Sequence, residues 1–152
     1  MAEALFNYWH SRKTSFTIET SSAGIAALEG LPATAETKKA LEEKGLSVDH
    51  HGSRPVTHEL VEESDLIVVM TASQREALFN RYPGARGKTR LLKQVVCSPQ
   101  EEAAAGMDVA DPLGGDLEIY RQTLQEIEKY VKKLVGNLEA IIPDLKNGGE
   151  SS

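Results

Sequence analysis

The sequence predicts an α/β fold, in which helices cover a mostly parallel β-sheet, for three reasons. Stretches with the alternating or continuous apolar pattern of strands are interleaved with stretches that have the apolar spacing of helices. One run, Leu66–Met70, is apolar throughout, as expected of a strand covered on both faces of a parallel sheet. A length of 152 residues, 40% of them hydrophobic, suits one domain with a real core.

The first 24 residues predict a helix, a strand and a turn. Ala2–Trp9 contains good helix formers and places apolar residues, among them Leu5 and Trp9, on one face. Ser15–Thr20 alternates and is rich in β-branched residues, which predicts a strand. The small residues of Ser21–Gly24 predict a turn where a backbone could approach closely.

Two helices are predicted between this turn and the apolar run. Thr34 can cap a helix that ends at Gly45. Thr57 can open a short helix through Val61. The segment His50–Pro55 between them is predicted to be a loop.

After the apolar run, the predicted order is helix, strand, loop and helix. Ser73–Glu76 matches a capping box, which predicts a helix from there to about Tyr82–Gly84. Arg90–Lys93 is predicted to be a short strand and Ser98–Met107 a loop. From Asp116 onwards a long final helix is predicted, because apolar residues recur at helical spacing. These are Tyr120, Leu124, Ile127, Val131 and Leu134.

Charge and composition exclude several classes of function. A net charge of −6 without a basic cluster argues against a nucleic-acid partner. One cysteine excludes an internal disulfide and suits a reducing compartment. No apolar run reaches membrane-spanning length and no signal-peptide profile is present, so we expect a cytoplasmic protein without a membrane partner. Residues 1–145 are expected to form one domain, and residues 146–152 a disordered tail.

The clearest chemical candidate is the carboxylate of Asp111, within Asp108–Gly115. Pro112 pushes Asp111 towards an extended conformation, and the pair Gly114–Gly115 allows a sharp turn before the final helix. A carboxyl group at the tip of a stiff loop is well placed to act as a general acid or base. The alternative is an ordinary Asp-Pro turn that introduces a helix.

Five stretches lie in a recognisable order: Met1–Phe6, Ser22–Gly24, His51–Thr57, Asp65–Thr71 and Asp111–Gly115. Together they resemble the motifs of the low-molecular-weight protein tyrosine phosphatase family in its bacterial form. The resemblance implies a three-layer, doubly wound parallel sheet. It also implies a cysteinyl-phosphate mechanism without a cofactor, in which Asp111 is the general acid. In this family, residues at the positions of Ser22 and His51 brace the phosphate-binding loop by hydrogen bonds.

The resemblance further implies a part that these 152 residues do not contain. In the family, the first strand lies in the middle of the sheet and ends in a phosphate loop, Cys-x5-Arg. Cys97 has no arginine at this spacing and two carboxylates nearby, and negative charge disfavours a thiolate and repels phosphate. Cys97 is therefore predicted to be non-catalytic. We expect a truncated, catalytically inactive chain whose sheet lacks its first strand.

Three functions remain open, and a phosphorylated protein is the expected partner in each. The first is a phosphatase for phosphotyrosine, the broader class in the family. The second is a protein arginine phosphatase, because Ile25–Gly30 has no aromatic residue and Leu113 stands where the family often has Tyr or Phe. The third is a non-catalytic scaffold or regulatory binding protein. His50, His51 and His58 lack the spacing of a zinc site, so no metal is expected.

Overall fold

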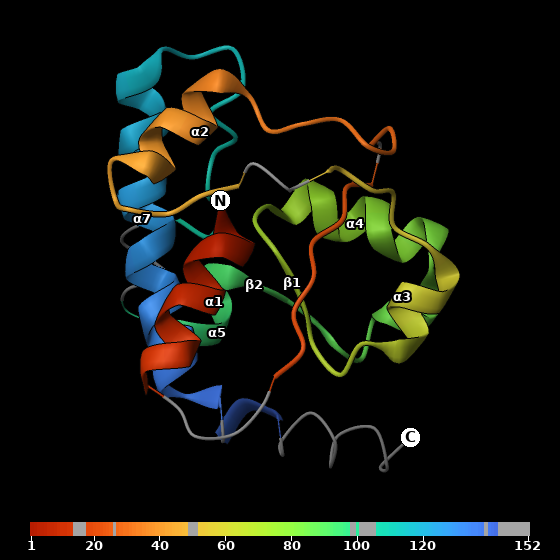
Figure 1. Cartoon of the computed structure of the whole chain (residues 1–152). Helices are drawn as coiled ribbons and strands as arrows, with labels where there is room; N and C mark the ends of the chain where they lie inside the picture. Colours follow the sequence, from red (N-terminus) through yellow and green to blue (C-terminus); the bar gives the residue numbers. More distant parts are fainter. Residues whose placement is uncertain are drawn as a thin grey trace.

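The computed structural model of the chain describes residues 1–13, 18–25, 27–48, 52–97, 100, 106–138 and 140–142. Figure 1 shows the arrangement of its helices and strands. In chain order the elements are α1 (Ala2–Lys13), α2 (Ala35–Glu42), α3 (His58–Glu63), β1 (Ile67–Val69), α4 (Ala72–Arg81), the 3-10 helix η1 (Pro83–Ala85), β2 (Thr89–Leu91), α5 (Leu92–Val96) and α7 (Leu117–Gly136).

The β-sheet of the described residues consists of the parallel strands β1 and β2. The register pairs Ile67 with Thr89 and Val69 with Leu91. The strand predicted over Ser15–Thr20 is not observed at 18–20, which carry no strand assignment, and residues 14–17 lie outside the described part. The α/β class is confirmed, while the larger sheet with a missing first strand stays a prediction.

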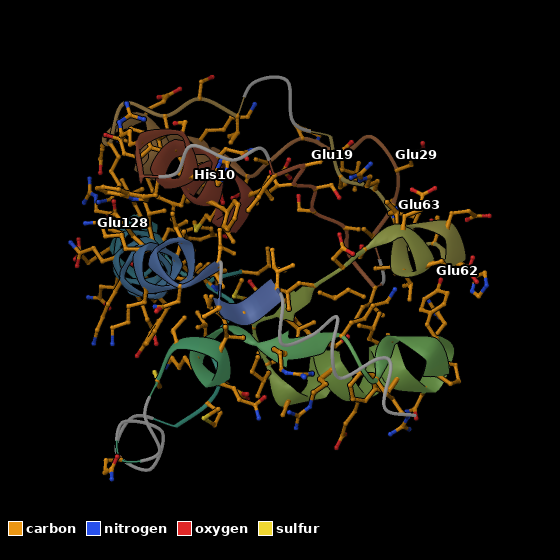
Figure 2. The ribbon with its side chains drawn as sticks, turned by 90° about the horizontal axis from the view of Figure 1, so that it is seen from below. His10, Glu19, Glu29, Glu62, Glu63 and Glu128 are labelled. Atoms are coloured by element: carbon orange, nitrogen blue, oxygen red, sulfur yellow. The ribbon has the colours of Figure 1, made fainter. Side chains whose placement is uncertain are left out.

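Helices cover both faces of this sheet, because the side chains of β1 alternate between two apolar clusters. Val68 packs into a large cluster with buried residues of α1, α2 and α7. Ile67 and Val69 pack into a smaller cluster with α3, α4 and η1. Figure 1 shows the same division, with α1, α2, α5 and α7 on one side of the strands and α3 and α4 on the other. Figure 2 places Glu128 of α7 far from Glu62 and Glu63 of α3.

The long helix α7 is the centre of the large cluster. Its N-cap is Asp116, whose Oδ1 accepts a hydrogen bond from the N–H of Ile119 at 3.0 Å. One face is buried along its whole length, which confirms the predicted helix: Tyr120, Thr123, Leu124, Ile127, Tyr130, Val131, Leu134 and Val135. Both α1 and α2 pack on this helix. The predicted helices at Ala2–Trp9, Thr34 and Thr57 are also confirmed.

Two predicted boundaries are wrong. Helix α4 begins after Thr71, two residues before the predicted capping box, because Thr71 accepts from the N–H of Gln74 at 3.1 Å. Gln74 Oε1 in turn accepts from the N–H of Met70 at 3.0 Å, so the overlapping Thr-x-x-Gln pattern forms a reciprocal cap that reaches the residue before the N-cap. The strand predicted over Arg90–Lys93 ends at Leu91, where the short helix α5 starts and packs on α7.

Candidate active site

The loop that carries Asp111 is attached to the carboxyl end of β1. The N–H of Val109 donates to the carbonyl of Met70 at 2.8 Å, and the Val109 side chain is buried in the large apolar cluster. Asp108 Oδ1 accepts from the N–H of Ala72 at 2.8 Å, in the first turn of α4. The loop is therefore fixed at the carboxyl end of a parallel strand, where α/β proteins place their ligand sites.

Asp111 itself is exposed and held in a tight turn. Its Oδ1 accepts a hydrogen bond from the N–H of Leu113 at 3.0 Å. The N–H of Gly115 donates to the carbonyl of Pro112 at 2.9 Å, and Gly114 has a positive φ of 86° that favours glycine. Within the described part of the chain, the second carboxyl oxygen of Asp111 has no partner. A carboxyl group placed in this way can donate or accept a proton.

Ser22 lies against the first turn of α1. Its hydroxyl donates a hydrogen bond to a carboxylate oxygen of Glu3, and its carbonyl accepts one from Arg54 Nε at 3.0 Å. The N–H of Gly24 donates to the carbonyl of Arg54 at 2.9 Å, so the predicted turn is joined to the segment before α3. The bracing role of Ser22 stays a prediction, since its described partner is Glu3.

Ser53 ties together the loop that leads from Gly24 to α2. Its hydroxyl donates to the carbonyl of Leu28 and accepts from the N–H of Leu31 at 3.0 Å. The Leu28 and Leu113 side chains are exposed to 70% and 73%, so both loops present an aliphatic residue to solvent. His51 lies outside the described residues, and its predicted role stays a prediction.

The predicted site residues are not joined directly. Among the described residues, no hydrogen bond or ion pair links Asp111 to Ser22. They are connected indirectly through the core. Val109, two residues before Asp111, and Leu5 of α1, the helix that Ser22 contacts, belong to the same apolar cluster. Sequence reasoning missed the supporting roles of Asp108, Glu3 and Arg54, since each acts on a partner that only folding brings near.

The structure also describes Cys97 and the side chains that could bind a metal ion. Cys97 is half-buried at the C-cap of α5. The described residues contain no group of three His, Cys, Asp or Glu side chains that could hold a metal ion. None of the helices searched in the described part of the chain is both long and apolar enough to cross a bilayer.

Solved structures of small protein phosphatases share this α/β fold. A YwlE mutant from Bacillus subtilis has a TM-score of 0.81 at 33% identity and covers 91% of this chain and 88% of its own. A low molecular weight protein tyrosine phosphatase from T. tengcongensis has a TM-score of 0.80 at 29% identity, covering 90% and 88%. The fold is thus that of a small phosphatase domain.

The family follows from the sequence comparisons. The family model for "Low molecular weight phosphotyrosine protein phosphatase" matches residues 1–144, so the chain belongs to this family. The chain is 34% identical to a protein-arginine-phosphatase of Bacillus subtilis strain 168 over 139 residues, covering 91% of this chain and 87% of the relative. It is 33% identical to the protein-arginine-phosphatase of Geobacillus stearothermophilus, covering 80% and 78%.

Proposed function

We propose that this chain carries the acid–base part of a protein phosphatase and that its substrate class is phosphoarginine in proteins. The carrying observation is the exposed Asp111 carboxylate, held by Leu113 N–H on a loop fixed to the end of β1. Asp111 would donate a proton to the leaving nitrogen when the P–N bond breaks, and would then accept a proton from the attacking water. In addition to Asp111, the reaction at phosphorus needs a thiolate as nucleophile and an arginine that binds the phosphoryl oxygens.

Phosphoarginine is supported by two observations. The two relatives that match at 33% and 34% identity are protein-arginine-phosphatases. The large hydrophobic side chains that the two loops expose are the aliphatic ones of Leu28, Leu31 and Leu113, whereas a pocket for a phosphotyrosine ring would gain from aromatic neighbours.

Phosphotyrosine in proteins is the second candidate. It is favoured by the family description and by 28% identity to a probable low molecular weight protein-tyrosine-phosphatase, EpsP, of Ralstonia nicotianae. A non-catalytic scaffold or regulatory role in the same fold is the third. For all three we propose a cytoplasmic location and a phosphorylated protein partner, without nucleic acid or membrane.

We propose that the nucleophile is supplied by residues other than the 152 of this sequence. The 152 residues contain one cysteine, Cys97, and no Cys-x5-Arg motif. We therefore propose that they hydrolyse no phosphomonoester or phosphoramidate alone, and that turnover requires a Cys-x5-Arg segment joined to them. A strand added in this way would also complete the sheet beside β1.

The test compares the chain alone with a fusion that adds a family strand and Cys-x5-Arg loop before Met1. The chain alone should release no phosphate from a phosphoarginine protein, a phosphotyrosine peptide or p-nitrophenyl phosphate. The fusion should hydrolyse phosphoarginine with the highest kcat/KM. Higher kcat/KM for phosphotyrosine would favour the second candidate, and an inactive but cooperatively folded fusion would favour the scaffold.

The fusion also tests Asp111. Asp111→Asn should lower kcat for phosphoarginine by about 100-fold or more, because the leaving nitrogen needs a proton. The loss should be smaller for p-nitrophenyl phosphate, whose leaving group is a weak base. Asp108→Asn, which keeps an oxygen for the N–H of Ala72, is the matched control and should retain activity. Equal losses for both substrates, or none, would remove Asp111 from the acid role.

A further inference from the structure

An open groove of about 390 Å³ lies between α4, β2 and the turn that follows η1. Arg75, Glu76 and Phe79 of α4 line it. The rest of the lining comes from Arg86, from Thr89 and Arg90 of β2, and from Gln94 of α5. No residue of the loop that carries Asp111 lines this groove, so it is separate from the site described above.

The groove has an excess of positive charge, with three arginines and one glutamate in its lining. No ion pair to Arg75, Arg86 or Arg90 is present in the described part of the chain, although Glu76 lies in the same lining. By contrast, Arg121 is paired with Glu43 at 2.7 Å. Three guanidinium groups without an ion pair to a described residue thus surround one hollow, on a chain with a net charge of −6.

Two of these arginines are already held in place. The guanidinium of Arg86 lies over the ring of Phe79, with 5.0 Å between the guanidinium carbon and the ring centroid. Arg90 Nη1 donates a hydrogen bond to the carbonyl of Thr89 at 2.9 Å. Because these contacts restrict the side chains before any ligand arrives, less conformational entropy is lost on binding.

We propose that this groove is a second anion-binding site, which takes a phosphoryl group by hydrogen bonds from Arg75, Arg86 and Arg90. Guanidinium groups present several N–H donors in a fixed fork that matches phosphate oxygens. The site goes beyond the proposed function, because it lies apart from Asp111 and needs no nucleophile. Its ligand is a phosphorylated side chain of a protein or free inorganic phosphate.

The test is an NMR titration of the 152-residue chain with inorganic phosphate and, separately, with a phosphorylated peptide. The expected result is a saturable shift of the N–H signals of Arg75, Arg86 and Arg90 with at least one of the two. Tighter binding of the peptide assigns the site to a phosphoprotein, and tighter binding of phosphate assigns it to the free anion. Absence of a shift at these residues with both ligands would overturn the proposal.

Variants separate binding of the anion in the groove from its electrostatic attraction to positive charges elsewhere on the chain. The double variant Arg75→Gln/Arg90→Gln should weaken binding by about tenfold or more, since it removes two charged donors. The matched double variant Arg12→Gln/Lys38→Gln, on α1 and α2, removes two positive charges elsewhere and should leave the affinity unchanged. Glu76→Gln removes a negative charge from the lining and should tighten binding by about threefold. The same affinity in all these variants would overturn the proposal.

Discussion

At the scale of single residues, the turn that carries Asp111 depends on a glycine. Gly114 has a φ of 86°, a conformation in which a Cβ atom would be strained. Its neighbour Gly115 is close to Ile119, whose Cγ2 would lie 2.9 Å from an added Cβ. Together they let the chain pass from Pro112 to the start of α7 while Asp111 stays at the tip.

We expect Gly114→Ala to lower the free energy of unfolding by about 1 kcal/mol, because alanine is disfavoured at positive φ. Urea unfolding followed by circular dichroism measures the change. Gly84→Ala is the matched control, since Gly84 has no positive φ and no heavy atom lies within 4 Å of its added Cβ. Equal losses in the two variants would show that φ at Gly114 is not the cause.

At the scale of elements, the start of α4 shows how local sequence patterns compete. Both Thr71 and Ser73 stand three residues before a Gln or a Glu, so each can open a capping box. The helix uses Thr71, which lies two residues after the end of β1 at Val69, so the chain turns into the helix almost at once. The fixed end of the strand thus decides where the helix begins.

Thr71→Ala should cost about 1 kcal/mol of stability, because the N–H of Gln74 loses its acceptor. Ser73→Ala should change stability by less than about 0.5 kcal/mol, since Ser73 is exposed within the helix. Thermal unfolding of the two variants checks both values. A larger loss for Ser73→Ala would place the N-cap where the sequence pattern predicted it.

The contact of α5 with α7 contains a buried cation. Lys93 is 4% exposed, and its Nζ lies 2.6 Å from Glu126 Oε1. The ammonium group also lies 5.3 Å from the centre of the Tyr130 ring. The Glu126 side chain is 38% exposed, so Glu126 keeps much of its hydration while Lys93 loses nearly all of its own.

We expect Glu126→Gln to destabilise the chain by about 1–3 kcal/mol, because it leaves a buried ammonium without a carboxylate. Lys93→Met should cost less than about 1 kcal/mol, since it replaces the cation by an apolar chain of similar length. Guanidinium unfolding curves measure both changes. The reverse order would mean that the attraction between the charges outweighs the cost of burying Lys93.

At the scale of the whole molecule, charged contacts hold α1 and α2 on α7. Arg121 binds both carboxylate oxygens of Glu43, at 2.9 and 2.7 Å, and this hydrogen bonding lowers the pKa of Glu43. At Glu128, burial raises the pKa, but the hydrogen bond from Lys44 at 2.6 Å and the one from Trp9 outweigh it. The pKa of Glu128 is therefore lowered as well.

These two shifts predict a loss of stability in acid. A carboxyl group whose pKa is lower in the folded state stabilises that state above its unfolded pKa, and the gain is lost as the pH falls through the folded value. We expect Tm to decrease as the pH is lowered below the ordinary glutamate value of 4.5. Glu43→Gln/Glu128→Gln should lower Tm at pH 7 and flatten this decrease. Glu59→Gln, on α3, is the control and should leave the profile unchanged.

Much of the fold is predictable from local patterns in the sequence. The apolar spacing of α7 and the caps at Thr34 and Thr57 each depend on residues within one helix. The continuous apolar run predicts β1 because both of its faces are covered. The strand at Arg90–Lys93 was predicted too long, since packing on α7 turns its second half into α5.

The sequence by itself determined the α/β class, the family and the turn that holds Asp111, because these follow from patterns between near neighbours in the chain. Only the tertiary structure decided what surrounds that turn. Asp108 meets Ala72 across 36 residues, and Ser22 meets Glu3 across 19. The three arginines that line the groove beside α4 and β2 likewise come from separate parts of the chain. Such contacts depend on how the helices pack on the sheet, which no short stretch of sequence encodes.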